Sequence, residues 1–177
     1  KTIKDLIGRG YRLFGENKVQ EANEKYKNLE LEKLDLHLIG PLQTNKVRLA
    51  LELFNTIQSI DREKLVKEIV KVKNKFKTKT SNFFIQVNIG EEEQKSGVSP
   101  ENLENLYAIC MHNSLNISGL MCIPPFDKNP KNYFDKLSSL RDKLNPNLKL
   151  SMGMSNDYEI SLKCGSNLIR VGSRIFS

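Results

Sequence analysis

The stretch LKLSMGMSNDYEI, residues 148–160, changes character half-way along its length. Its first half alternates apolar side chains in the manner of a half-buried strand, whereas its second half is small, polar and acidic. Apolar residues at helical spacing then resume, and Gly165 marks the expected end of that helix. A strand that passes through a hydroxyl-rich loop into a helix predicts one βα unit of a parallel sheet.

The same unit recurs along the chain. Short apolar or β-branched runs predict seven strands, at residues 11–14, 36–39, 56–60, 83–88, 117–121, 148–152 and 168–171. Segments of helical period lie between them, and the best example has apolar residues at Leu65, Ile69, Val72 and Phe76. Another helix is expected to begin with Ser99 as the N-cap and Pro100 at the first helical position.

Strand–helix alternation fits two architectures, an open doubly wound sheet and a closed (β/α)8 TIM barrel. No glycine-rich dinucleotide fingerprint follows any expected strand, which disfavours the open sheet. Seven strands are one short of a barrel, and the chain begins on Lys1 in what reads as a helix. We therefore expect a barrel whose first strand precedes Lys1, and one domain over residues 1–177.

Composition excludes several classes of protein. The chain has no apolar run long enough to cross a membrane and no signal-peptide pattern, and its cysteine usage predicts a cytoplasmic protein. The formal charge of +7 comes from 28 basic and 21 acidic residues. Because the lysines are mixed with acids and few aromatics accompany them, we interpret them as a solvated surface and expect no nucleic-acid partner. The odd number of cysteines, Cys110, Cys122 and Cys164, predicts free thiols.

Polar or glycine-containing clusters follow the expected strands, at residues 15–17, 40–43, 88–90, 151–157 and 172–173. In a barrel these positions are the C-terminal ends of the strands, where active sites are built. Turns also need glycine and asparagine, so each cluster taken alone reads equally well as an ordinary loop.

The last two clusters together predict a phosphate site, because the loops after the last two strands of a barrel often bind phosphate. Their glycines, Gly153 and Gly172, would let the backbone approach a phosphate closely. Their serines, Ser151, Ser155 and Ser173, offer hydroxyl donors. A helix N-terminus adds bare N–H groups. Ser155 would serve equally as the N-cap of a helix that begins at residues 156–157.

Few other residues suggest chemistry. Arg170, near the end of the last strand, either pairs with a buried acid or contacts a ligand in the barrel mouth. His37 alternates with apolar neighbours and is expected to be structural, and His112 is expected to be exposed at a helix end. No cluster of residues suits a metal site or a nucleophilic triad.

Six strings together resemble one known family: FGENKVQE (14–21), LHLIGPLQTNK (36–46), IQVNIGEEEQKSG (85–97), GLMCIPP (119–125), LSMGMSNDYE (150–159) and IRVGSRIF (169–176). They resemble the YggS/PROSC family of pyridoxal phosphate homeostasis proteins, and the likeness runs from about residue 3 to the C-terminus. It implies an alanine-racemase-like barrel that holds pyridoxal 5′-phosphate (PLP) as a Schiff base to a lysine at the end of the first strand.

The resemblance also implies a function and a set of site residues. Its members are expected to be cytosolic and monomeric or weakly associating. They are thought to bind and buffer PLP and to deliver it, for example to PLP-dependent apoenzymes, without robust catalysis. Ser155, Gly172 and Ser173 match its phosphate positions, Arg170 the arginine that faces the pyridine nitrogen, and Asn17 an asparagine near the ring. The expected cofactor-binding residues are therefore Asn17, Met154, Ser155, Arg170, Gly172 and Ser173.

The sequence departs from the family pattern at several lysines and one arginine. The Schiff-base lysine is expected upstream of Lys1, which itself aligns to the following helix. Lys18 stands where the family usually has tyrosine, and Arg174 replaces a small residue beside the phosphate loop, with its side chain expected in solvent. Lys95, beyond the fourth strand, is a candidate for a secondary imine because it lies on the ligand face.

Two other functions remain open from sequence. One is a PLP-dependent amino-acid racemase, which would need an acid and a base on opposite sides of the ring. The other is a barrel enzyme acting on a different phosphorylated ligand, which would share the phosphate site without the contact from Arg170 to the ring.

Overall fold

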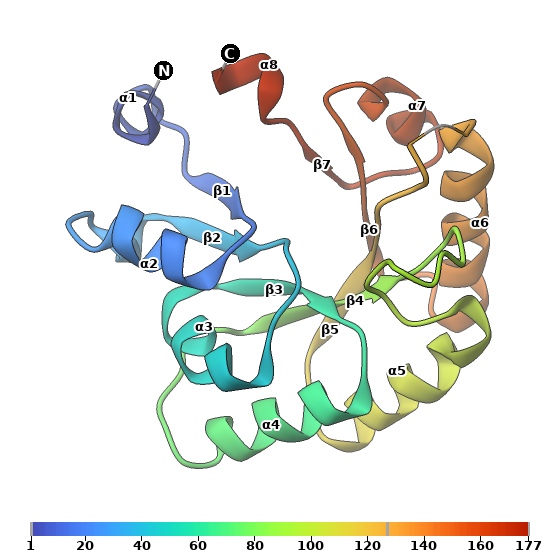
Figure 1. The fold of residues 1–177 in the computed structure, drawn as a ribbon, viewed down its shortest axis with the longest axis horizontal. Coiled ribbons are helices and arrows are strands. Elements are labelled where there is room, and N and C mark those ends of the chain that lie inside the picture. The colour runs from blue at the N-terminus through green and yellow to red at the C-terminus, as the bar shows by residue number, and fades with distance from the viewer. Residues whose placement is uncertain (1, 127, 177) are drawn as a thin grey trace.

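The computed structural model describes residues 2–126 and 128–176. Seven parallel strands form one sheet in which each strand pairs with its neighbours in the sequence. Figure 1 shows the sheet curving round on itself, so that β1 and β7 approach each other across an open side. The strands are β1 (Leu13–Glu16), β2 (Asp35–Leu38), β3 (Thr56–Ile60), β4 (Asn82–Val87), β5 (Ile117–Cys122), β6 (Lys149–Met154) and β7 (Leu168–Arg170).

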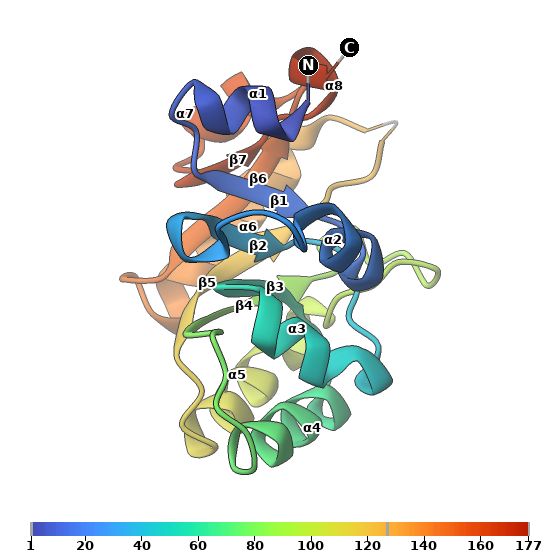
Figure 2. The ribbon, with the colours of Figure 1, turned by 90° about the vertical axis from the view of Figure 1, so that its left-hand side faces the viewer.

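Helices cover most of the outside of the sheet, and the first and last of them lie at its open side (Figures 1 and 2). They are α1 (Ile3–Gly8), α2 (Val19–Tyr26), α3 (Val47–Leu53), α4 (Glu63–Lys73), α5 (Leu103–His112), α6 (Pro130–Leu144), α7 (Tyr158–Lys163) and α8 (Ser173–Phe176). Three short 3₁₀ helices, η1 (Leu31–Lys33), η2 (Thr44–Lys46) and η3 (Pro100–Asn102), lie in the connections. The alternation of strand and helix predicted from sequence is therefore correct.

All seven strand positions are confirmed, with shifts at their ends. β1 runs two residues later than expected, so Gly15 and Glu16 lie within the strand rather than in the loop after it. β6 likewise extends to Met154, which leaves the loop after it to begin at Ser155. Both runs continue because their backbone groups pair with the neighbouring strand, which side-chain polarity does not report.

The helix ends follow local signals in part. Ser99 and Pro100 do begin a helical segment, although its first turn is the 3₁₀ helix η3. Along α4, Leu65, Ile69 and Val72 are buried as predicted, but Phe76 lies beyond the helix end and is 40% exposed. Its ring lies under the guanidinium of Arg48, 4.1 Å from the ring centroid.

The first described helix, α1, begins with Thr2 as its N-cap. Thr2 accepts a hydrogen bond from the Asp5 amide, and the Asp5 carboxylate accepts one from the Thr2 amide, which is a complete capping box. The prediction that the chain starts inside a helix is therefore wrong for the described residues. Lys1 itself lies outside them.

The strands separate two kinds of environment. On the helix side, strand residues such as Leu36 and Leu38 pack with helix residues such as Tyr26 in one apolar core. On the inner side the strands carry polar side chains that bond to one another across the barrel. Within residues 2–126 and 128–176, no strand pairs with the outer edge of β1 or of β7. The inner side chains and this open side together set the position of the site.

Candidate functional site

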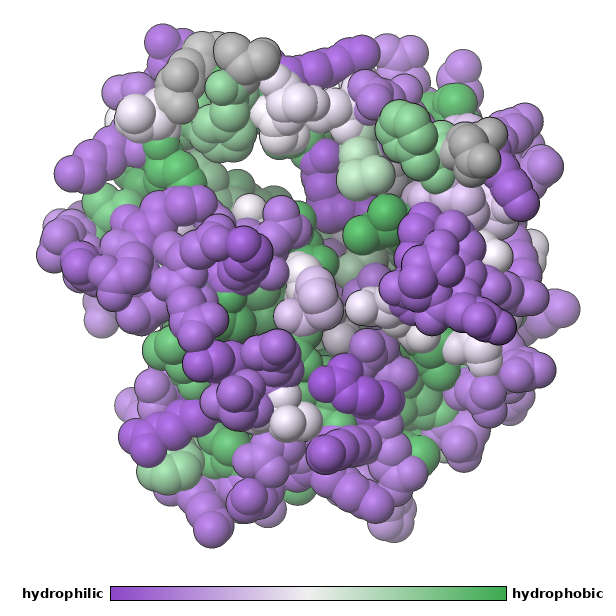
Figure 3. All heavy atoms as spheres, viewed as in Figure 1, coloured by the Kyte–Doolittle hydropathy of each residue, from purple (hydrophilic) through white to green (hydrophobic). Residues whose placement is uncertain are grey.

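A cavity of about 1620 Å³ occupies the barrel mouth and the open side between β1 and β7. Figure 3 shows the molecule hollowed at this side, with polar and apolar side chains around the opening. All six residues expected to bind the cofactor line it: Asn17, Met154, Ser155, Arg170, Gly172 and Ser173. The barrel thus brings together residues that are up to 156 positions apart in sequence, from Asn17 to Ser173.

One end of the cavity is formed by the loops after β6 and β7. Ser155 is buried, and its Oγ accepts a hydrogen bond of 3.4 Å from the Gly172 amide, so the two loops meet. The alternative in which Ser155 caps the next helix is wrong, because α7 begins at Tyr158 with Asp157 as its N-cap. Gly165, with φ +89°, ends that helix as expected.

Gly153 has a backbone conformation that favours glycine, with φ +94°. A Cβ at this position would lie 2.0 Å from the Ser161 Oγ and 2.7 Å from its Cβ. Gly153 therefore lets β6 pass close to α7. Its role is to shape the strand end, rather than to leave room for a ligand directly.

Ser151 is not part of the phosphate end, contrary to the sequence interpretation. It is fully buried in β6, where its Oγ lies 2.5 Å from Gln58 Oε1 and accepts a hydrogen bond from Arg170 Nη1. Because strand residues alternate between faces, Ser151 points into the barrel, three residues before the end of β6 at Met154.

Arg170 lies at the interior end of the cavity. Its guanidinium donates to the Ser151 hydroxyl at 2.9 Å and to the Cys122 carbonyl at 2.8 Å. Within the described part of the chain it forms no ion pair with an acid, so the first of the two roles considered for it is not found. Burial lowers the pKa of Arg170, an effect opposed by the nearby Cys122 and Asp157, yet guanidinium groups stay protonated in proteins.

Asn17 follows β1 and is exposed at the mouth. Gly40, after β2, packs directly on it: a Cβ at Gly40 would lie 2.0 Å from the Asn17 carbonyl oxygen. Met154, at the end of β6, is 37% exposed, and its amide donates to Asp157 Oδ1 at 2.6 Å. These contacts fix the backbone of both residues at the cavity wall.

The lysines singled out from sequence differ in position. Lys95 lines the cavity, but its amine pairs with Glu92 at 2.6 Å, and an amine held as a paired ammonium is a poor nucleophile. Lys18 is exposed and pairs with Glu21 at 2.6 Å. Lys1 lies outside the described residues.

Arg174 does not simply extend into solvent. Its guanidinium lies over the Tyr158 ring, 5.3 Å from the centroid, and donates to the Tyr158 hydroxyl at 3.3 Å. The side chain is exposed and lies beside the cavity. The contact between α8 and α7 thus holds the two loops of the cavity together.

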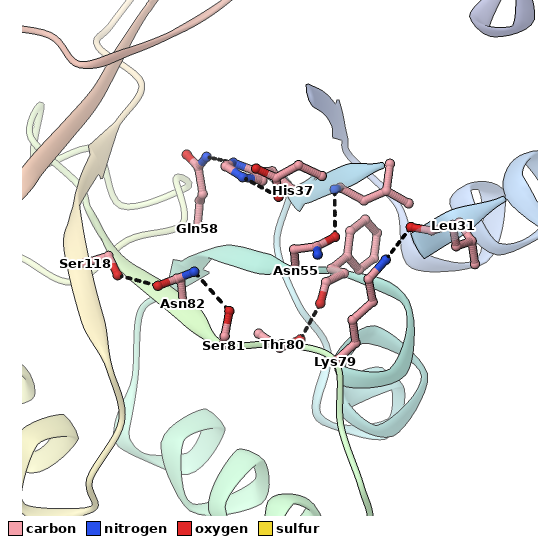
Figure 4. A network of polar contacts seen from close by, with 12 residues as sticks. Leu31, His37, Asn55, Gln58, Lys79, Thr80, Ser81, Asn82 and Ser118 are labelled. Atoms are coloured by element: carbon pink, nitrogen blue, oxygen red, sulfur yellow. Dashed lines mark hydrogen bonds and ion pairs between the residues drawn. The ribbon is translucent and has the colours of Figure 1, made fainter. Parts of the chain in front are cut away.

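Gln58 was not predicted from sequence as a site residue, and His37 was predicted to be structural. Both line the cavity and bond to each other at 2.8 Å (Figure 4). A polar residue at an inward position of an otherwise apolar strand was the available signal for Gln58. His112 is exposed, and the three cysteines are free, as expected.

Among the described residues, no group of three or more histidine, cysteine or acidic side chains is arranged to hold a metal ion. None of the helices described has the length and apolar character needed to cross a bilayer.

The chain is 39% identical over 186 residues to the pyridoxal phosphate homeostasis protein of Aquifex aeolicus, an alignment that covers 99% of this chain and 81% of that protein. The chain belongs to the pyridoxal phosphate homeostasis protein family. The family resemblance drawn from sequence is therefore confirmed. No family model matches the chain.

Solved structures place the fold of this family member. PipY of Synechococcus elongatus superimposes without PLP at a TM-score of 0.88 and 32% identity, and with PLP bound at 0.81 and 30%; each alignment covers 99% of this chain and 86% of PipY. Alanine racemase of Oenococcus oeni shares the fold alone, at a TM-score of 0.75 and 17% identity over 98% of this chain and 51% of the racemase. The alanine-racemase-like barrel predicted from sequence is confirmed.

Proposed function

We propose that this chain binds PLP and acts in vitamin B6 homeostasis, by holding and delivering the cofactor and so affecting amino-acid and keto-acid balance, without robust catalysis of its own. The observation that carries the proposal is one cavity with hydroxyl and amide donors at its outer end and a partly buried guanidinium, that of Arg170, at its inner end. Support comes from PipY, a relative whose structure has PLP bound.

The donors at the outer end fit a phosphate group. Ser155, Gly172 and Ser173 offer two hydroxyls and a backbone amide on two adjoining loops. The bond from the Gly172 amide to Ser155 is long, at 3.4 Å, so an anion's oxygen would replace it at little cost. A Cβ at Gly172 would meet nothing within 4 Å, which shows that the space over this backbone is open to a ligand.

The inner end fits the ring nitrogen of the cofactor. When bound, PLP supplies an electrophilic aldehyde and an electron-accepting ring. Arg170 is a permanent donor, so the pyridine nitrogen that faces it would accept a hydrogen bond and would stay unprotonated. An unprotonated ring is a weaker electron sink than one paired with a carboxylate, which suits a carrier better than a transaminase. Asn17 and Met154 would contact the ring from the mouth.

This protein would pass PLP to PLP-dependent apoenzymes and would act in the cytoplasm as a monomer or weak dimer. Residues 1–177 would act as one PLP-binding domain, since all the proposed contacts come from one continuous sheet.

Equilibrium dialysis with PLP tests the proposal. We expect saturable binding to the unmodified chain, and a dissociation constant about tenfold higher in Ser155→Ala combined with Ser173→Ala, because two phosphate donors are lost. Ser139→Ala, an exposed hydroxyl on α6, is the matched control and should leave binding unchanged. Pyridoxal without its phosphate should bind much more weakly. Absence of binding, or equal affinity for pyridoxal and PLP, would refute the proposal.

Covalent attachment is tested separately, by borohydride treatment of the PLP-loaded chain followed by peptide mass spectrometry. The ion pair with Glu92 argues against Lys95 as the attachment point. We therefore expect Lys95→Ala to leave the amount of trapped cofactor unchanged. If trapping disappears in that variant alone, Lys95 is the attachment point after all.

A further inference from the structure

A continuous chain of hydrogen bonds crosses the barrel interior from β7 to β2. Arg170 Nη1 donates to Ser151 Oγ at 2.9 Å, and Ser151 Oγ lies 2.5 Å from Gln58 Oε1. Gln58 Nε2 lies 2.8 Å from His37 Nδ1, and His37 Nε2 lies 3.3 Å from Asp35 Oδ1. Figure 4 shows Gln58 and His37 pointing toward each other from neighbouring strands.

The donors in this chain all point the same way. The guanidinium only donates, so the Ser151 oxygen accepts from it and its hydroxyl proton goes to the Gln58 carbonyl oxygen. The Gln58 amide nitrogen then donates to His37 Nδ1, which must be unprotonated to accept. The remaining ring proton is on Nε2 and faces the Asp35 carboxylate. The chain therefore runs from a cation at one end to an anion at the other.

Because these side chains are buried, their hydrogen-bond donors and acceptors cannot easily change partners. Ser151 is fully buried, Gln58 is 2% exposed and His37 is 8% exposed, so water has little access to replace a missing partner. Burial lowers the pKa of His37, against the opposing effect of Asp35, which favours the neutral ring that the chain requires.

Arg170 is held at two nitrogens at once. Nη1 bonds to Ser151 and Nη2 to the Cys122 carbonyl, from strands β6 and β5. Two bonds on different nitrogens fix the plane of a guanidinium, so its other N–H groups keep one direction toward the cavity. The Cys122 contact comes from backbone, whereas the Ser151 contact depends on side chains that can be changed.

We propose that Ser151, Gln58 and His37 are positioning residues, which hold the Arg170 guanidinium as a fixed, correctly oriented donor to the ring nitrogen of the ligand. The inference rests on the proposed binding of PLP for its consequence, but the chain of hydrogen bonds can be tested in the ligand-free protein. Gln58 is the central member because it joins the half near Arg170 to the half near Asp35.

Two substitutions at Gln58 separate the halves of the chain. Gln58→Glu keeps an acceptor for the Ser151 hydroxyl but, when ionised, has no donor for His37. Gln58→Met is similar in size and removes both contacts. Ser118→Ala is the matched control, because Ser118 Oγ donates to Asn82 Oδ1 at 2.9 Å between two other strands and takes no part in the chain.

Nitrogen-15 NMR of the ligand-free protein gives the first readout. In the unmodified protein and in Ser118→Ala, we expect a neutral His37 with its proton on Nε2 and slow rotation of the Arg170 guanidinium. In Gln58→Glu, His37 should become protonated on Nδ1 while Arg170 stays slow. In Gln58→Met, the Arg170 guanidinium should rotate faster.

The second readout is the chemical shift of PLP labelled with nitrogen-15 in its ring, together with its dissociation constant. We expect Gln58→Met to bind PLP about fivefold more weakly, as for the loss of one well-aligned hydrogen bond, and to shift the ring nitrogen signal. Ser118→Ala should change neither quantity. A global loss of structure in Gln58→Met would be apparent in its spectrum, and Ser151→Ala, which removes the side-chain partner of Arg170 Nη1 and should also speed rotation of the guanidinium, then carries the comparison.

The outcomes are distinguishable. If His37 has its proton on Nδ1 in the unmodified protein, or if Arg170 mobility is the same in all variants, the positioning role is refuted whether or not PLP binds. If the NMR of the free protein is as expected but the unmodified chain does not bind PLP, the proposed function fails and with it the role toward the ring. If PLP binds with the same affinity and ring signal in all variants, only the positioning inference is overturned.

Discussion

Gly40 illustrates how a single residue sets the shape of the cavity wall. A Cβ there would overlap the Asn17 carbonyl oxygen at 2.0 Å, and that oxygen belongs to backbone that cannot turn aside. We predict that Gly40→Ala lowers the free energy of unfolding by about 2 kcal/mol, since the loop must shift to admit the methyl group. Urea denaturation measures the effect.

The control for this prediction is Gly8→Ala. A Cβ at Gly8 meets nothing within 4 Å and Gly8 lies in a helix, so the substitution should be neutral or slightly stabilising. Equal losses of stability in the two variants would show that contact with Asn17 is not the cause.

His37 gives the protein a pH dependence of known sign. Burial lowers its pKa below the 6.5 of an ordinary histidine; Asp35 opposes this effect and Lys149 adds to it. The unfolded chain therefore takes up a proton at a pH where the folded chain does not, so acidification through this range favours unfolding.

We predict that unfolding free energy falls between about pH 7.5 and about pH 5.5, and that His37→Gln loses less over the same interval than the unmodified protein. His112→Gln, at an exposed position, should behave like the unmodified protein. Thermal or urea unfolding at several pH values measures this. An unchanged slope in His37→Gln would contradict the assignment.

Individual residues also show where sequence reasoning succeeds. Asn17, Ser155 and Gly172 could be placed at one end of the barrel because strand ends converge there whatever the details of packing. Ser151 was misplaced because β6 continues to Met154, so its hydroxyl lies inside the barrel, below the loop that follows the strand. Gln58 was missed because its partners, Ser151 and His37, come from distant parts of the chain.

At the scale of one element, α4 shows the energetic weight of an apolar helix face. Leu65, Val66 and Ile69 are fully buried, whereas Lys67 on the same helix is exposed and pairs with Glu63. We predict that Ile69→Ala lowers the free energy of unfolding by about 3 kcal/mol, through lost apolar contact and the cavity left behind.

Lys67→Ala on the same helix should cost less than about 0.5 kcal/mol, because an exposed ion pair contributes little. Chemical denaturation of both variants makes the comparison. If Ile69→Ala were as stable as Lys67→Ala, the packing of α4 on the sheet would not be as described.

Whole elements were easier to predict than their ends. All seven strands were found because each is a short apolar or β-branched run between polar loops. The end of α4 was set too late because Phe76 continues the apolar period, yet it lies beyond the helix and stacks under Arg48. Periodicity reports which residues avoid water, and a stacked surface ring avoids part of it as well.

For the whole molecule, cysteine reactivity reports global opening. Cys110 and Cys122 are fully buried, and burial raises the pKa of each thiol to about 12. Cys164 is only partly buried; its burial and, to a smaller extent, the nearby Asp135 raise the pKa of its thiol. We predict that a thiol reagent labels Cys164 first and the other two more than about a hundredfold more slowly, through unfolding.

Cys164→Ser provides the check on this prediction, because the variant should have no fast-reacting thiol. Added urea below the unfolding transition should accelerate the slow labelling of Cys110 and Cys122 together. Rapid labelling of either buried cysteine in the absence of urea would show that the sheet opens locally at that position.

The strictly sequential strand order has a kinetic consequence. Because each strand of the described residues pairs only with the strands before and after it in the chain, the sheet can grow by adding one βα unit at a time, and no early step has to join distant segments. β3, β4, β5 and β6 are all longer than β1, β2 and β7. Folding is therefore expected to start within β3–β6 and spread toward both ends, so β1 and β7, which border the open side of the cavity, join the sheet last.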